Sequence, residues 1–249
     1  MNKKVALVTG ASQGIGKGIA KELATNGYIT YVTYLKNRDK GKETVKEIET
    51  AAGQAILVQL DVRSQESVKK AFDQIKQEQG RLNVLVNNAA IDILKSIETI
   101  AFQEWQDVVD TKINGNFLCT KYALPLMKNQ DNPNVIIITS SLGDRPDTDD
   151  PSYCVGTAGT IAFVKSMALY LSRYGIRTNA ISPGETRTGM WDNIEGVDDG
   201  FWKRTAKNNP MGKIATPKAI ATATMMIIND KTRFLNGNFI YVNGGGHLK

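Results

Sequence analysis

Short apolar runs of strand length alternate with longer helical patterns through most of the chain. A first run at residues 5–8 is followed by a helical pattern that ends near Gly27, and a last run at 239–242 closes the series. The strand candidates are almost continuously apolar, as parallel strands are when both of their faces are buried. We therefore expect an α/β fold, a doubly wound parallel sheet with helices on both faces.

The alternation also indicates the element boundaries. The expected strands lie at 5–8, 28–34, 56–60, 84–86, 135–138 and 239–242, with a sixth strand of the sheet just before Pro183; the expected helices lie at 15–26, 38–52, 64–79, 102–128, 153–174 and 217–229. A length of 249 residues suits one α/β domain, and no repeat or linker divides it. No signal peptide and no apolar run near the roughly 20 residues of a membrane span is evident, so we expect a cytoplasmic protein without a membrane partner.

Charge and composition exclude several classes of function. The only histidine, His247, stands near the end of the chain, which argues against His-based triads and metal sites, so no metal is expected. The net charge of +6 favours an anionic ligand, such as a dinucleotide phosphate or an acyl carrier. The cations are scattered and lack interleaved aromatics, which argues against nucleic acid. Cys119 and Cys154 have no metal or disulfide spacing, and we expect two buried thiols.

A glycine-rich loop, TGASQGIG at 9–16, follows the first strand and opens the first helix. Glycines at 10, 14 and 16 let the backbone approach a pyrophosphate, whose charge the helix N-terminus stabilises. The second strand then ends in Thr33-Tyr-Leu-Lys-Asn-Arg38, with two cations and no acid to hold a ribose 2′-hydroxyl. This pattern favours NADP(H) over NAD(H). The alternatives are that the glycines form only a tight turn and that the two cations belong to a solvated loop.

Further motifs follow the later strands in a fixed order. They are Asp61-Val62, Asn87-Asn-Ala-Ala90, Ser140, Tyr153 thirteen residues later, Pro183-Gly184 with Thr188, and the ending Tyr241-Val-Asn-Gly-Gly245. Together with the glycine loop they resemble the short-chain dehydrogenase/reductase family over essentially the whole chain, and most of all its 3-oxoacyl-(acyl-carrier-protein) reductases. The resemblance implies one Rossmann-type domain over 1–249 with about seven strands, and a substrate-covering segment at 185–212.

The resemblance also implies roles for single residues. The cofactor would bind at Gly10, Ser12, Gln13, Gly14, Ile15, Gly16, Lys36, Arg38, Asp61, Val62, Asn87, Ala89, Pro183, Gly184 and Thr188. Ser140 would hold the substrate carbonyl, and Tyr153 would protonate it as hydride arrives from the nicotinamide. A homo-tetramer or dimer built on the two long helices, and a place in fatty acid or polyketide biosynthesis, would follow from the same likeness.

Two residues depart from the family pattern. The family places a lysine four residues after the tyrosine, where it lowers the tyrosine pKa, and this chain has Thr157 there. The family asparagine in the long helix before the fifth strand is replaced by Lys112 in Thr111-Lys-Ile-Asn-Gly-Asn-Phe117. We hypothesise that the catalytic set is Lys112, Ser140, Tyr153 and Thr157, with the Lys112 ammonium in the space that the missing lysine leaves. The alternative is an ordinary helix lysine beside an inactive site.

The segments around the site leave further alternatives open. The acidic loop 144–151 is either solvated or selects against anionic substrates, and the aromatics of 185–212 either cover an apolar acyl substrate or pack a small helix pair. Lys121, Lys128 and Arg173 are candidate contacts for an acyl carrier protein, but Tyr174 stands where carrier-linked reductases often have arginine. The leading function is an NADPH-dependent reductase of small or carrier-bound 3-oxoacyl substrates. A catalytically silent, cofactor-binding partner subunit and non-redox chemistry are the alternatives.

Overall fold

The structure is a computed structural model that describes residues 3–191 and 196–248. Its sheet has seven parallel strands in the order β3-β2-β1-β4-β5-β6-β7. The strands are β1 (Val5–Val8), β2 (Ile29–Tyr34), β3 (Gln54–Gln59), β4 (Val84–Asn87), β5 (Asn134–Ile138), β6 (Arg177–Pro183) and β7 (Phe239–Val242). The order reverses between β1 and β4, and this switch point is where open parallel sheets bind ligands. The predicted fold class is confirmed.

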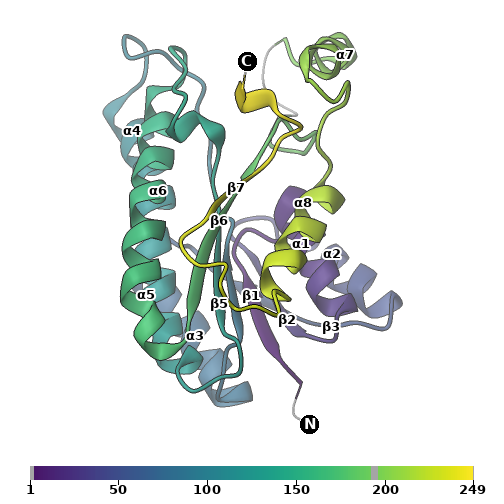
Figure 1. The fold of residues 1–249 in the computed structure, drawn as a ribbon, viewed down its shortest axis with the longest axis vertical. Coiled ribbons are helices and arrows are strands. Elements are labelled where there is room, and N and C mark those ends of the chain that lie inside the picture. Colours follow the sequence, from purple (N-terminus) through teal and green to yellow (C-terminus); the bar gives the residue numbers. More distant parts are fainter. Residues whose placement is uncertain (1–2, 192–195, 249) are drawn as a thin grey trace.

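Helices cover both faces of this sheet, as Figure 1 shows. On one face lie α3 (Gln65–Gln79), α4 (Phe102–Val109), α5 (Gly115–Met127) and α6 (Pro151–Leu171); on the other lie α1 (Gly14–Thr25), α2 (Arg38–Thr50) and α8 (Pro217–Ile228). The buried apolar side chains form one core under each layer, because each strand sends alternate residues to opposite faces. The remaining helix, α7 (Asp199–Asn208), stands beyond the carboxyl ends of the strands.

Local signals explain most helix starts. Ser64 and Thr216 accept hydrogen bonds from the backbone N–H groups of Ser67 and Ala219, so each caps the helix that follows it. Asp150 does the same for α6, where it accepts from the backbone N–H of Tyr153 at 3.2 Å. Observed and expected boundaries differ by two residues or fewer for most elements.

The segment expected as one helix at 102–128 is interrupted. Between α4 and α5 the chain forms a π-helical turn at Asp110–Asn114, which contains Lys112. A π-helical turn widens the helix by one residue and changes which side chains face the domain interior. Lys112 is buried as a result, whereas Asn114 stays at the surface and donates a hydrogen bond to Asp110.

The longest helical stretch, Pro151–Tyr174, joins α6 to a 3₁₀ turn at Ser172–Tyr174 and has a mean hydropathy of 1.4. By length and composition it could cross a membrane, although small and polar residues keep its sequence from appearing as one apolar run. Val164, Ala168 and Leu171 are buried against the sheet, as in the core helix of a folded domain. Packing in this domain accounts for these buried residues, while Val155, Leu169 and Tyr170 of the same helix are exposed.

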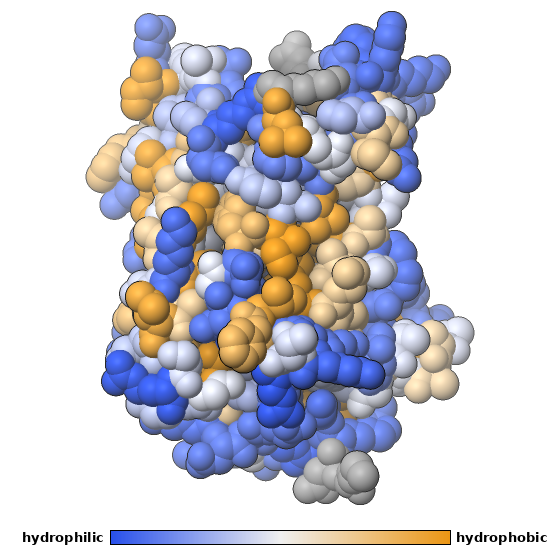
Figure 2. Space-filling view, in the orientation of Figure 1, coloured by the Kyte–Doolittle hydropathy of each residue, from blue (hydrophilic) through white to orange (hydrophobic). Residues whose placement is uncertain are grey.

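An apolar area remains visible at the edge of the sheet. Figure 2 shows hydrophobic residues gathered over the middle of the face where β7 lies in Figure 1. All four residues of β7 are only partly buried, and β7 pairs on one side alone. Nearby Leu169, Met226 and Phe234 are also exposed.

Candidate active site

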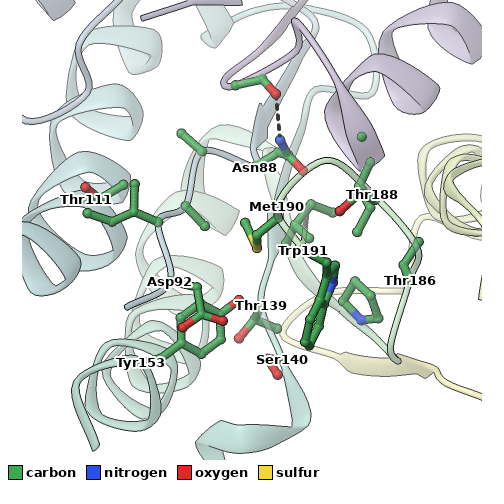
Figure 3. A pocket seen from close by; sticks show the side chains of 18 of the residues that line it. Asn88, Asp92, Thr111, Thr139, Ser140, Tyr153, Thr186, Thr188, Met190 and Trp191 are labelled. Carbon is green, nitrogen blue, oxygen red and sulfur yellow. Dashed lines mark hydrogen bonds between the residues drawn. The ribbon is translucent and has the colours of Figure 1, made fainter. Parts of the chain in front are cut away.

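A cavity of about 650 Å³ lies at the carboxyl ends of the strands around the switch point. Fourteen of the residues predicted for the site line it: Gly10, Ser12, Gln13, Gly14, Ile15, Lys36, Asp61, Val62, Ala89, Ser140, Tyr153, Pro183, Gly184 and Thr188. Five predicted residues do not: Gly16, Arg38, Asn87, Lys112 and Thr157. Figure 3 shows the arrangement of the lining side chains.

The glycine loop forms one end of the cavity. Gly10 and Gly14 have φ angles of +63° and +60°, a conformation that strains other residues. A Cβ at Gly10 would lie 3.1 Å from Ala89 Cα. A Cβ at Gly16 would overlap the Gly10 carbonyl, so Gly16 allows the loop to fold closely although it does not line the cavity. Helix α1 begins here without a side-chain cap, which leaves its first N–H groups for an anion. This end therefore fits a dinucleotide pyrophosphate.

Two consecutive asparagines, Asn87 and Asn88, stand at the end of β4, and the second of them lines the cavity in place of the predicted first. Asn87 is buried below the cavity, where its amide donates to Thr120 at 3.3 Å. Asn88 lines the cavity instead, and its amide donates to the carbonyl oxygens of Thr9 and Gly10 at 2.9 and 3.1 Å. Asn88 thus holds the glycine loop against β4. The motif locates this pair in the sequence but does not tell which of the two faces the loop.

The end of β2 supplies the cations predicted for a 2′-phosphate. Lys36 lines the cavity, whereas Arg38 is the first residue of α2 and is exposed outside it. Lys40, not singled out from the sequence, donates to the Gln13 side chain at 2.8 Å and so lies against the glycine loop. Lys40 lies three residues after Asn37, the N-cap of α2, so the two residues share one side of the first helical turn. This spacing could have indicated Lys40 from the sequence.

Asp61 and Val62 line the cavity next to the β2 end, as predicted. Burial opposes ionisation of Asp61, but side-chain and backbone hydrogen bonds from Arg63 outweigh it and hold its pKa below the usual value. Arg63 also pairs with Asp107 at 3.0 Å. A group bound at this wall meets an ion network in which one guanidinium is shared by two carboxylates.

Ser140 and Tyr153 lie at the other end of the cavity. Ser140 follows β5 by two residues, and its Oγ accepts from the Leu142 N–H at 3.3 Å. Tyr153 is in the first turn of α6, which Asp150 caps. The sheet and the helix cap thus fix both hydroxyl-bearing side chains, and the structure brings them to one end as the sequence predicts.

Lys112 reaches Tyr153 from below the cavity. It is only 3% exposed, and its Nζ lies 3.8 Å from the centre of the Tyr153 ring, in a cation–π contact. Its stem passes over Gly156, where an added Cβ would come within 3.0 Å of Lys112 Cδ. The missing side chain at Gly156 therefore makes room for the lysine. Burial lowers the Lys112 pKa to about 8, against the negative charges of Asp92 and Asp150.

Thr157 is fully buried but makes no polar contact of its own. Its Oγ1 has no hydrogen-bond partner among the described residues. An added Cβ on Gly143 would lie 2.8 Å from Thr157 Cγ2, so the threonine packs under the loop that follows Ser140. Thr157 acts here as a packing residue.

Two carboxyl groups that the sequence analysis did not single out stand beside Tyr153. Asp92 and Asp150 both line the cavity, and the Asp92 carboxyl lies close enough to disfavour the charged form of Asp150. Burial, the hydrogen bond to Asp92 and its charge raise the pKa of Asp150 to about 7. An Asp before a Pro-initiated helix is a recognisable cap, whereas nothing in the sequence near Asp92 marks it.

The pKa of Tyr153 is raised, first by desolvation and then by the charges of Asp92 and Asp150. This differs from the depressed pKa that the hypothesis of a relocated cation implies. The ammonium of Lys112 faces the ring and not the hydroxyl, so its field at the oxygen is weaker than that of a lysine beside the oxygen.

The segment 185–212 contributes Met190 and Trp191 to the cavity. The Trp191 ring lies 5.8 Å from Phe201 and 5.6 Å from Trp202, the latter edge-to-face. The aromatics of this segment thus pack on one another around α7, the one helix described in it, and Trp191 also lines the cavity; that the segment covers a substrate stays a prediction. Residues 192–195 of the predicted segment lie outside the described part.

Comparison with known proteins agrees with this arrangement. A family model described as enoyl-(acyl carrier protein) reductase matches residues 10–247. The chain is 33% identical over 245 residues to the 3-oxoacyl-(acyl-carrier-protein) reductase FabG of Staphylococcus aureus, covering 98% of each.

Two solved structures have the same fold. The angucycline C-6 ketoreductase LanV with bound NADP superposes with a TM-score of 0.90 at 25% identity, covering 99% of this chain and 96% of LanV. A short-chain type dehydrogenase/reductase from Mycobacterium marinum gives 0.89 at 27% identity, covering 98% and 95%. With its switch-point cavity, its glycine loop and these full-length matches, the chain belongs to the short-chain dehydrogenase/reductase family of oxidoreductases.

Proposed function

We propose that the chain is an NADPH-dependent carbonyl reductase that acts on a 3-oxoacyl thioester or a related ketone, with Tyr153 as the proton donor. The observation that carries the proposal is the contact between Lys112 Nζ and the Tyr153 ring, at 3.8 Å. The chain lacks the lysine that its family places after the tyrosine, yet a buried cation still lies against that tyrosine.

The residues that would hold the cofactor follow from the cavity. The glycine loop and the first turn of α1 would bind the pyrophosphate, and Lys36 would meet the 2′-phosphate. When bound, NADPH supplies the hydride. The NADP that accompanies LanV in its structure supports this choice of cofactor.

The chain itself orients the carbonyl and protonates it. Ser140 Oγ would donate to the carbonyl oxygen, and the Tyr153 O–H would break as the new alcohol O–H forms. The carbonyl carbon gains the hydride, and the tyrosinate recovers its proton from water. Because burial and the neighbouring acids raise the pKa of Tyr153, the tyrosine stays protonated at neutral pH. Reduction needs this form, whereas alcohol oxidation needs the tyrosinate.

The role of Lys112 is electrostatic in this proposal. Its ammonium would stabilise the negative charge that develops on Tyr153 as the proton leaves. Thr157 would contribute packing only, since its hydroxyl has no polar partner among the described residues. The effective catalytic set is then Ser140, Tyr153 and Lys112.

The 3-oxoacyl thioester is proposed as the unit that the site recognises, on a carrier protein or on a small thiol. FabG, the relative from S. aureus, is named for carrier-bound substrates. Within one chain, however, Arg173 lies twenty residues beyond Tyr153 along α6, about 30 Å at the rise of a helix. Arg173 thus lies in the turn after the far end of this helix, away from the cavity. Kinetics with a carrier-bound and a small-thiol thioester would show what the carrier adds.

One observation favours a second candidate, a subunit that binds cofactor without turnover. Lys112 approaches the ring face of Tyr153, and the Tyr153 pKa is raised and not lowered. NADPH oxidation with a 3-oxoacyl thioester distinguishes the two: turnover supports the reductase, and NADPH binding without turnover supports the silent subunit.

A residue swap makes this test sharper. Thr157→Lys alone places a second ammonium next to a filled space, and overpacking costs about 1–3 kcal/mol. The double variant Lys112→Asn with Thr157→Lys restores the family pattern without that conflict. Under the reductase proposal, wild type and double variant both turn over and Lys112→Asn alone is impaired. Activity in the double variant alone would favour the silent subunit.

We also propose a cytoplasmic homo-oligomer. The partly buried, unpaired β7 edge and the exposed Leu169, Met226 and Phe234 beside it are surfaces that a second copy would cover. Sedimentation of the purified chain would report its oligomeric state, and a monomer at micromolar concentration would contradict this part of the proposal.

A further inference from the structure

The cavity is divided by charge. Its only cations among the described lining residues are Lys36 and Arg63, both at the cofactor end, and Arg63 is paired with Asp61 and Asp107. The end that holds Tyr153 is lined by the carboxyl groups of Asp92, Asp147 and Asp150. Apolar side chains such as Met190 and Trp191 complete it. A substrate bound beside Tyr153 therefore meets acids and apolar surface.

These acids have no cation in the cavity to neutralise them. Within the described part of the chain, Asp92 and Asp150 form no ion pair within 4.0 Å. The cation whose field they share is Lys112, which is buried below the cavity. Three carboxyl groups, those of Asp92, Asp147 and Asp150, thus share this end of the cavity with one ammonium that is buried below it. A further anion bound here would meet these acids and no cation in the cavity wall at this end.

Two polar atoms at this end are buried without a protein partner, Asp92 Oδ1 and Thr139 Oγ1. Thr139 is 4% exposed and lines the cavity, and in Figure 3 its side chain extends toward Tyr153 and Asp92. Buried polar atoms are normally hydrogen-bonded, so a lone acceptor and a lone hydroxyl beside a cavity indicate a ligand group that pairs with them. An acceptor such as a carboxylate oxygen calls for a donor.

We propose that Asp92 is a specificity-determining residue that selects ketones carrying an uncharged hydrogen-bond donor beside the carbonyl and rejects those carrying a carboxylate. This inference rests on the proposed reductase function and narrows its substrate class. A donor such as a hydroxyl or an amide N–H would bind Asp92 Oδ1, with Thr139 Oγ1 as a second partner. A 3-oxoacyl thioester is uncharged near its ketone and so escapes the rejection, although it carries no donor there, whereas the corresponding free acid is rejected.

The test uses three short methyl ketones of similar size that end in a hydroxyl, a methyl or a carboxylate group. NADPH oxidation gives kcat/KM for each with the wild type, Asp92→Asn and, as a matched control, Asp149→Asn. Asp149 is an exposed carboxylate of the loop that carries Asp147 and Asp150, and it does not line the cavity. We expect the wild type to prefer the hydroxyl over the methyl ketone, and either over the carboxylate. The hydroxyl-to-carboxylate ratio should fall by about tenfold or more in Asp92→Asn and stay unchanged in Asp149→Asn.

Equal kcat/KM for the three ketones in the wild type, or an unchanged ratio in Asp92→Asn, would overturn the inference while the reductase function stands. If the asparagine variant does not fold, Asp92→Ser is measured in its place. If no ketone turns over, the reductase proposal fails instead. Equilibrium binding of the ketones then tests whether Asp92 selects the hydroxyl over the carboxylate. Ligand-observed NMR with Tyr153→Phe and NADP⁺ should then rank the hydroxyl ketone above the carboxylate, and the reverse order would refute it.

Discussion

The substitution Lys112→Met removes the buried ammonium and keeps a flexible stem of similar length. A charge 3.8 Å above the ring centre lies roughly 5 Å from the phenolic oxygen, which at an effective dielectric constant of about 20 corresponds to about 3 kcal/mol. If about half of the negative charge has developed on Tyr153 in the transition state, the loss is about 1.5 kcal/mol, close to a tenfold decrease in rate.

NADPH oxidation with a 3-oxoacyl thioester measures this loss. We expect kcat to fall by about tenfold in Lys112→Met with little change in KM, because the interaction strengthens only as charge develops. Lys165→Met is the matched control, since Lys165 is an exposed lysine on the same helix as Tyr153 and its removal should leave kcat unchanged. An unchanged kcat in a folded Lys112→Met enzyme would refute the electrostatic role.

Three further predictions use other contacts of the site. Lys36→Ala should raise KM for NADPH by about tenfold and leave KM for NADH unchanged, whereas Arg38→Ala outside the cavity should change neither; equal effects of the two variants would contradict the assignment. Gly156→Ala should keep the fold but lower kcat, because the added methyl group displaces the Lys112 stem, and unaltered kinetics with an intact circular dichroism spectrum would count against this contact. Asp150 has an ordinary pKa of 3.8 and a folded-state pKa of about 7, so between these values the folded state holds a proton that the unfolded state has lost. The free energy of unfolding should therefore decrease as pH rises from about 4 to about 7, by up to about 1.4 kcal/mol per unit, and urea titrations of Asp150→Asn should lack this slope.

Much of the fold could be predicted because it depends on local patterns. The strand at 5–8 appears at the expected residues, since four consecutive apolar side chains fit only a strand buried on both faces. The sixth and seventh strands and the caps of α3 and α8 follow from similar local signals. The π-helical turn at Asp110–Asn114 could not be predicted in this way, because the sequence pattern on either side of it is helical and no local signal marks the turn.

The candidate site was only partly predictable from the sequence. Motif spacing located the loop, Ser140 and Tyr153, because each follows a strand and the carboxyl ends of parallel strands meet at one edge. It could not show which face of Tyr153 the Lys112 ammonium approaches, since that depends on the π-helical turn and on the space at Gly156. Asp92 stayed hidden because a single acid in a loop has no periodic pattern, and only the fold places it beside Asp150.

The physical consequence is a charge arrangement that differs from its family's usual one. A buried lysine lies against the ring of Tyr153, while burial and the charges of Asp92 and Asp150 raise the pKa of the same tyrosine. Because each group's ionisation depends on the others, exchanging any one alone is expected to change the pKa of its neighbours.

The electrostatic role of Lys112 requires that a charged Lys112 is buried against the Tyr153 ring, and the NMR signals of the Lys112 side chain test this placement. With isotope-labelled lysine, we expect the Lys112 Cε methylene protons to be shifted upfield by the aromatic ring and to titrate with a pKa of about 8. The upfield shift should disappear in Tyr153→Leu. Unshifted signals that titrate near the ordinary lysine value of 10.5 would place the ammonium in solvent and contradict the account.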